Sequence, residues 1–111
     1  MSIGGNIKGM IQVKTTTTNA IGEQVEAWVD AQPLKGWLDM TDGEARYNAY
    51  QAKIQDSSHI FTCDYEPLDG RITDENSRMV INEKRYDVKL IDNPMEMNAQ
   101  LEIYLKFTGG Q

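Results

Sequence analysis

Two side chains with metal-binding or nucleophilic chemistry lie close together in this sequence: the single histidine, His59, and the single cysteine, Cys63. On a helix, a spacing of four residues could present both to one metal ion. The surrounding stretch "SSHIFTCDY" is typical of a strand, and four residues along a strand cover about 13 Å. A shared metal ion and a Cys–His nucleophile pair are therefore both disfavoured. We expect His59 and Cys63 to lie on one face of a strand, with Phe61 between them.

Carboxylates are the next candidates, because paired acids can do acid–base chemistry. They fall in turns or at a helix start, where acids are common for structural reasons: Asp39, Asp42, Glu44 and the "DEN" at 74–76. The glycines form no GxGxxG or GxxxxGK[ST] pattern, so no phosphate-binding loop is indicated. The sequence predicts no enzyme, no cofactor and no metal site; a hydrolase with an unrecognised site is the least favoured alternative.

Nucleic-acid binding is opposed by the charge balance. The chain carries 17 acidic and 11 basic side chains, a net charge of -6, and its lysines and arginines form no cluster. Non-specific binding to DNA depends on basic groups that displace phosphate counterions. Trp28, Trp37 and the five tyrosines could stack on bases, but without basic neighbours they are expected to lie in the core and at its rim.

The length of 111 residues fits one domain, and 40% hydrophobic with 25% charged residues lies within the globular range. We expect a single barrel domain over residues 7–108, with flexible tails at 1–6 and 109–111. One cysteine allows no internal disulfide, which fits a reducing compartment. No stretch approaches the 18 apolar residues of a membrane span, so we expect a protein made in the cytosol, or part of something assembled there, with no membrane partner.

The elements that would position any site are mostly strands. Alternating apolar and polar residues, bounded by turn residues, predict a mostly β chain, a small β-barrel of about six to seven short antiparallel strands. Asn19 and Gly22 predict a hairpin turn, with Val25, Ala27 and Val29 on one face and Trp28 on the other. Pro33 is expected to break the chain between two strands. The predicted strands lie near residues 7–16, 25–31, 34–40, 58–65, 79–81, 85–91 and 101–107.

One helix is predicted within this β pattern, over about residues 42–54. "TDGE" has the form of a capping box, in which the Thr41 hydroxyl accepts from the amide of Glu44. Alanines, tyrosines and Ile54 then recur at three- and four-residue spacing. This segment either covers one end of the barrel or projects from it as a functional element.

The last quarter of the chain, "KRYDVKLIDNPMEMNAQLEIYLKF", contains two alternating runs joined by a polar link. We expect the apolar residues of both runs to face each other inside the barrel: Tyr86, Val88 and Leu90, then Leu101, Ile103 and Leu105. Long polar loops on a rigid scaffold commonly carry contacts. The link from Asp92 to Gln100 is therefore a candidate ring or tail contact loop, represented by Asp92, Asn93, Pro94, Met95 and Met97.

The order of these segments resembles the small head–tail adaptor proteins of long-tailed bacteriophages, also called head-completion or stopper proteins. The resemblance is carried by "NAIGEQVEAWVD", "GWLDMTDGEARYNAYQAK", "HIFTCDY", "RMVINEKRYDVKLIDNP" and "LEIYLKF". It covers roughly residues 7–108, and the order of the motifs matters more than any one of them.

The resemblance implies a non-enzymatic structural protein at the virion neck of a phage or prophage. Members form homo-oligomeric rings below the portal and its adaptor, contact tail proteins, and continue a channel through which DNA passes without sequence-specific binding. Residues 41–57 would correspond to a segment that projects toward the lumen and helps to close it. The candidate lumen residues are Glu44, Arg46, Tyr47, Tyr50 and Lys53. The alternatives are a tail terminator or other neck protein, and a cytosolic β-barrel module that binds a peptide or protein.

Overall fold

The computed structural model describes residues 5, 7–40 and 57–110. Within these ranges the chain forms six strands and one short 3-10 turn. The elements are β1 (Ile7–Thr18), β2 (Gln24–Met40), β3 (His59–Asp64), β4 (Ser77–Ile81), β5 (Lys84–Asp92), η1 (Pro94–Glu96) and β6 (Gln100–Gly110). The predicted mostly β fold is confirmed. The helix predicted over residues 42–54 lies outside the described residues.

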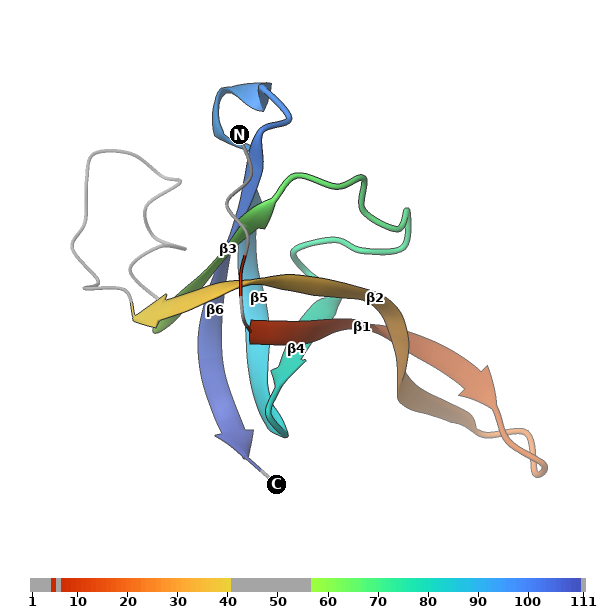
Figure 1. Ribbon diagram of the computed structural model, residues 1–111. Helices are drawn as coiled ribbons and strands as arrows, with labels where there is room; N and C mark the ends of the chain where they lie inside the picture. The colour runs from red at the N-terminus through yellow and green to blue at the C-terminus, as the bar shows by residue number, and fades with distance from the viewer. Residues whose placement is uncertain (1–4, 6, 41–56, 111) are drawn as a thin grey trace.

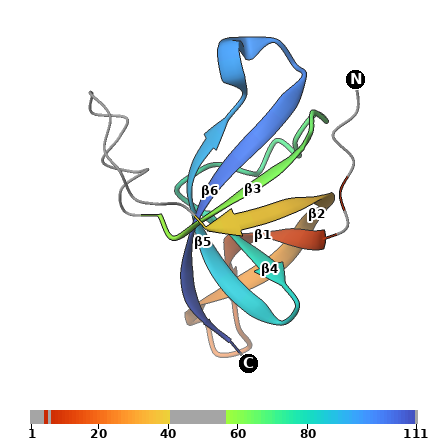
Figure 2. The same ribbon diagram turned by 60° about the vertical axis from the view of Figure 1, so that its left-hand side comes forward.

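The six strands form one closed, entirely antiparallel barrel in the order β1-β2-β3-β6-β5-β4. The barrel closes through four residue pairs between β1 and β4, from Met10 opposite Val80 to Val13 opposite Ser77. Figures 1 and 2 show β6 between β3 and β5. Closure gives every strand two neighbours over part of its length, so exposed edges remain only where a strand extends past its neighbour.

The break predicted at Pro33 is wrong: residues 24–40 form one continuous strand, β2, in which Pro33 lies opposite Met10 of β1. The other edge of β2 pairs with β3 only from Gly36 to Met40. At Pro33, therefore, one edge of β2 has no partner strand, and a proline is tolerated where its nitrogen faces such an edge. Ile11 lies opposite Gln32 and Gln12 opposite Asp30, so Ala31 is an extra residue that bends β2 close to Pro33.

Within the barrel the core is built from side chains that alternate inward and outward along each strand, except where a bulge shifts the alternation. Phe61 and Cys63 of β3 are both buried, and His59 at the end of the same face makes an edge-on ring contact with Tyr86 at 5.1 Å. The predicted shared face of β3 is confirmed. The buried cluster is Ile11, Leu34, Phe61, Cys63, Met79, Ile81, Tyr86, Val88, Leu101, Ile103 and Leu105.

One predicted core residue is misplaced. Tyr86 and Val88 point inward as expected, but Leu90 does not belong to the buried cluster. Val88 lies opposite Leu105 and Leu90 opposite Tyr104, so β5 contains a bulge at Lys89. One extra residue exchanges the two faces of a strand. Beyond the bulge, Ile91 takes the inward position opposite the buried Ile103.

β4 and β5 are joined by the tight connection that "NEK" predicted. Ile81 pairs with Lys84, and the two residues between them, Asn82 and Glu83, both have positive φ, 51° and 68°. Two successive positive φ values are the signature of the mirror-image turn that matches the twist of a hairpin. Beside this turn, β6 continues to Gly110, which pairs with Lys84 and lies two residues past the boundary expected for the barrel.

The β1–β2 hairpin is longer than the barrel that contains it. β1 contacts β4 only up to Val13 and β2 contacts β3 only from Gly36. At the base of the remaining part of the hairpin, the Lys14 amide donates to the Asn76 carbonyl at 2.9 Å and Arg78 lies over the Trp28 ring. Otherwise residues 14–18 and 24–28 have only each other as strand partners, and with the connecting residues 19–23 they form a two-stranded extension. We call residues 14–28 the arm; Figure 1 shows it leaving the barrel at the lower right.

Candidate interaction surfaces

Residues with catalytic or metal-binding potential are not brought together in the part of the chain that the structure describes. Across residues 5, 7–40 and 57–110, no three His, Cys, Asp or Glu side chains are placed to share a metal ion. The His59 ring packs on Tyr86 and its Nδ1 lies 2.8 Å from the Ser58 hydroxyl. Burial raises the pKa of the Cys63 thiol to about 11, and a protonated thiol is a poor nucleophile. Cys63 is part of the core, and His59 packs on Tyr86 at the edge of the core.

The predicted contact loop between β5 and β6 is described, and it presents two methionines to solvent. Met95 is 87% exposed and Met97 is 67% exposed. Singly exposed apolar side chains are common on protein surfaces, but two methionines exposed in one loop can adapt to a partner, which keeps this loop a candidate contact surface. Figure 1 shows this loop, with η1, at the top of the molecule. We call residues 92–99 the methionine loop.

The methionine loop is held by its own polar side chains. The Asn93 side chain donates to Asn98 Oδ1 at 2.8 Å and its own Oδ1 accepts from the Asn98 amide at 3.1 Å. Met95, Glu96 and Asn98 all have positive φ, between 52° and 56°, a conformation that non-glycine residues adopt only when the surroundings impose it. The loop therefore has a defined shape in which the methionines point outward, a feature the sequence did not reveal.

The candidate lumen residues Glu44, Arg46, Tyr47, Tyr50 and Lys53 lie outside the described residues, and their role stays a prediction. The two ends of that segment are described. Met40, the last residue of β2, lies opposite His59, the first residue of β3. The segment therefore leaves and re-enters the barrel at two adjacent backbone positions.

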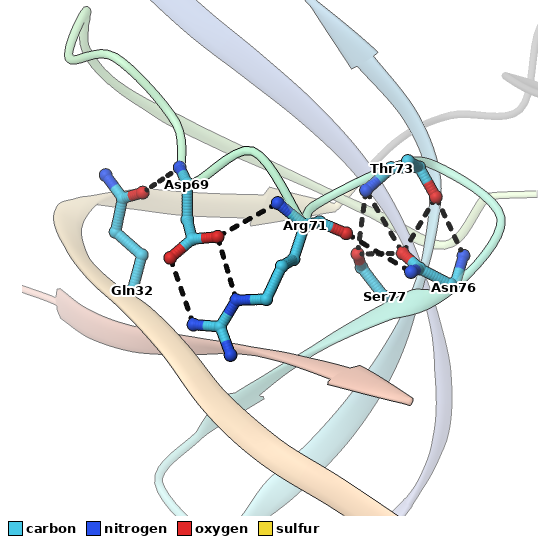
Figure 3. Close-up of polar contacts among 6 residues, drawn as sticks. All are labelled: Gln32, Asp69, Arg71, Thr73, Asn76 and Ser77. Atoms are coloured by element: carbon cyan, nitrogen blue, oxygen red, sulfur yellow. Dashed lines mark hydrogen bonds and ion pairs between the residues drawn. The ribbon is translucent and has the colours of Figure 1, made fainter. Parts of the chain in front are cut away.

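A third loop, residues 65–76 between β3 and β4, carries a polar network that sequence reasoning missed (Figure 3). The Gln32 side chain of β2 accepts from the Asp69 amide at 2.7 Å and donates to the Pro67 carbonyl at 3.1 Å. The Asn76 Oδ1 accepts from the Thr73 amide, the Thr73 hydroxyl and the Ser77 hydroxyl. The loop is thus bonded to β2 at one point and to the start of β4 at the other.

Asp69 and Arg71 form a two-pronged ion pair within this loop. Arg71 Nε donates to Asp69 Oδ1 at 2.9 Å and its Nη2 donates to Oδ2 at 3.0 Å. These hydrogen bonds, together with one from the Arg71 amide, lower the pKa of Asp69 from 3.8 to about 2. Because both carboxylate oxygens are occupied by Arg71, the pair shapes the loop and leaves little of either charge for a partner.

The tip of the arm is a further exposed apolar point. Ile21 is 78% exposed, in a turn built by Asn19, whose Oδ1 accepts from the amides of Ile21 and Glu23. An isoleucine in the polar turn "NAIGEQ" was the only signal in the sequence. In both ribbon views the methionine loop lies at the top and the arm tip toward the bottom, at opposite ends of the molecule (Figures 1 and 2).

These features define a class: a small closed β-barrel that displays defined apolar loops at opposite ends, as a protein-interaction module does. The comparisons with known proteins specify it further. The sequence matches the phage head completion protein family over residues 8–106. Since this match spans most of the chain, the protein belongs to the phage head completion protein family, a family of structural phage proteins whose partners are portal and tail components.

The predicted family is thereby confirmed. No curated protein matches the chain. In the described residues, no helix has both the length and the apolar character that crossing a membrane requires. Membership of the family makes this chain a virion component.

Proposed function

We propose that this protein forms a homo-oligomeric ring at the virion neck, continues and closes the DNA channel below the portal–adaptor complex, and docks the tail without catalysing a reaction. The single observation that carries the proposal is the family match over residues 8–106. The methionine loop supports the docking role. Its methionines are exposed and its backbone is held by the Asn93–Asn98 hydrogen bonds, and a loop that is ordered before binding loses less conformational entropy when a partner binds.

The net charge of -6 supports a conduit role. Packaged DNA must move past the inner surface of such a ring, and an acidic protein repels the phosphate backbone. In this proposal residues 41–56 narrow the channel, with Glu44, Arg46, Tyr47, Tyr50 and Lys53 as the candidate lumen residues. The assembly takes place in the bacterial cytoplasm, before the virion is released.

The ring is tested with phage heads that carry portal and adaptor but lack this protein. Purified protein added to such heads is expected to give a ring below the portal in negative-stain images and to retain the packaged DNA. A binding assay against the isolated portal–adaptor complex provides the second readout. Failure to bind either preparation would contradict the proposal, and binding only to tail tubes would favour a tail terminator.

The channel role is tested by replacing residues 41–56 with a short Gly/Ser loop. Because Met40 lies opposite His59, a short loop can join β2 to β3 without altering the barrel. The variant is expected to bind heads but to lose packaged DNA, measured as nuclease-accessible DNA. A variant that binds heads and retains DNA would remove the channel role from this segment, and loss of the fold would assign it to covering the barrel.

The docking role is tested with Met95→Gln combined with Met97→Gln, which keeps the side-chain length and removes the apolar surface. We expect normal head binding and weaker tail attachment. Met40→Gln is the matched control, because Met40 is also 77% exposed but lies outside the loop. Equal loss of tail attachment in the control would show that the methionine loop is not the specific contact.

A further inference from the structure

The β1–β2 ribbon carries opposite charges at its two ends. At the end near the start of β1, Lys8 lies directly opposite Lys35, and both side chains are exposed. Like charges facing each other across a strand pair are unfavourable. Among the residues that the structure describes, neither ammonium group has an ion-pair partner. We call Lys8 and Lys35 together the lysine rung. In a chain of net charge -6, two facing lysines without an ion-pair partner among the described residues are a feature that the isolated fold does not explain.

The other end of the ribbon, the arm, is acidic. The Glu23 carboxylate accepts a long hydrogen bond from the Asn19 side-chain amide, at 3.3 Å. Glu26 has a loose ion pair with Lys14, at 3.8 Å, in which both side chains are largely exposed. The two carboxylates flank the arm tip, where Ile21 is 78% exposed and Val25 is 42% exposed.

The lysine rung also has an apolar neighbour. Trp37 lies two residues beyond Lys35 in β2, so both point to the outer face of the barrel, and Trp37 is 43% exposed. The basic end of the ribbon therefore offers two facing positive charges beside an aromatic surface, and the exposed Asp39 follows Trp37 on the same outer face of β2. The acidic end offers two negative charges beside an isoleucine. The two ends are therefore complementary: their charges are opposite in sign, and each end has an exposed apolar side chain.

The two ends are also too far apart to meet within one molecule. Ten residues separate Lys8 from Thr18 along β1, a distance of about 33 Å in a strand. A contact between the basic end and the acidic end must therefore join different copies. Such a contact is head-to-tail, and repetition of one head-to-tail contact closes into a ring when the rotation between copies permits.

We propose that the arm tip of one copy (Ile21, Glu23 and Glu26) docks on the outer face of the next copy at Lys8, Lys35 and Trp37. The inference rests on the proposed ring and names the surfaces that would join its subunits. The occupant is a second copy of this chain, because the acidic and apolar groups that complement the lysine rung lie at the opposite end of the same ribbon.

The test uses charge reversal with rescue, in the full chain, on portal-bearing heads that lack this protein and by sedimentation of the purified protein at low salt. Lys8→Glu with Lys35→Glu is expected to lower ring assembly about tenfold or more, and Glu23→Lys with Glu26→Lys should do the same. The chain with all four changes keeps the net charge and is expected to recover assembly. Glu83→Lys with Lys84→Glu, in the β4–β5 turn, is the matched control and should assemble normally.

Each outcome decides between the two proposals. Normal rings from both double variants, or no recovery in the fourfold variant, would overturn the docking contact and leave the ring function standing. Normal rings combined with weaker binding of a short DNA duplex by the lysine variant would place Lys8 and Lys35 against DNA and also overturn it. No ring from the unaltered protein on portal-bearing heads would remove the proposed function and this contact with it.

Discussion

The barrel and the arm are built from the same two strands, yet they are stabilised in different ways. Inside the barrel, β1 and β2 each gain a second neighbouring strand, and core residues such as Ile103 are fully buried. Beyond its base, where Lys14 and Trp28 contact Asn76 and Arg78, the strands of the arm have only each other, and Ile21 at the tip is 78% exposed. A two-stranded ribbon alone is marginal in water. The barrel thus supplies the stability, and the arm extends backbone and side chains to where a partner can reach them.

The largest contrast is expected in thiol labelling. Cys63 is buried in the barrel and burial raises its pKa to about 11, so it should react with a disulfide reagent at pH 8 only after unfolding. The variant Ile21→Cys adds a thiol at the arm tip that should react at once. We expect rates that differ by at least about a thousandfold, because labelling of Cys63 requires an opening close to global unfolding.

Equally fast labelling of both thiols in the native protein would contradict the distinction between barrel and arm. Labelling of the variant in denaturant, where both thiols should react, provides the control for reagent and protein quality.

The second contrast compares one substitution at two isoleucines. Ile103→Ala removes side-chain atoms from a fully buried site and should lower the free energy of unfolding by about 2–5 kcal/mol. Ile21→Ala, at the exposed tip, should change it by less than about 0.5 kcal/mol. Urea denaturation followed by tryptophan fluorescence measures both. A large loss from Ile21→Ala would mean that the arm packs against the barrel.

The third contrast locates the boundary between the two regions. Gln12 joins β4 to β2 across β1: its Oε1 accepts from Arg78 Nε at 2.8 Å and its Nε2 donates to Asp30 at 2.8 Å. Gln12→Ala should lower the free energy of unfolding by about 1–2 kcal/mol, because Arg78 and Asp30 lose their common hydrogen-bond partner. Thr17→Ala, further along the arm, removes one long hydrogen bond to the Val25 carbonyl, at 3.4 Å, and should cost less than about 0.5 kcal/mol. Equal losses of unfolding free energy in Gln12→Ala and Thr17→Ala would place the boundary between barrel and arm beyond Val13, closer to the arm tip.

The smallest effect concerns the exposed loop on the barrel side. The pKa of Asp69 is lowered from 3.8 to about 2, first of all by hydrogen bonds from Arg71. A lowered pKa means that the charged form favours the folded state. The stabilisation of the fold by the charged Asp69 carboxylate is therefore present above about pH 4 and is lost as the pH falls through about 2. Carboxyl NMR titration should show the lowered pKa, and Arg71→Ala should return it toward 3.8. A pKa unchanged by that substitution would contradict the cause.

The sequence predicted the strands, the hairpin at Asn19–Gly22, the tight turn at Asn82–Glu83 and the barrel, because alternation and turn chemistry are local. It did not predict the bulge at Lys89 or the continuity of β2 through Pro33. Both depend on which residues lie opposite in the neighbouring strand, or on whether an edge has a neighbour at all. The lengths of β3 and β4 decide where the barrel ends and the arm begins, so the arm could not be recognised within β1 and β2 alone.

The loop between β5 and β6 was located correctly, but its shape was not predictable, and its role as a contact loop stays a prediction. Asn93 and Asn98 meet only because the chain turns through three residues with positive φ. The polar network of residues 65–76 likewise depends on Gln32, which lies more than 30 positions earlier in the sequence.

The position of β6 also sets when this molecule can fold during its synthesis. β6 is the last of the described strands in chain order, yet it lies between β3 and β5 in the barrel. Until β6 has left the ribosome, β3 and β5 each have an unpaired edge, and the wall stays open between them. Non-local pairing of this kind is slow compared with helix or hairpin formation. The barrel is therefore expected to close in a single step that waits for β6, so a subunit becomes competent for assembly only after β6 has been made.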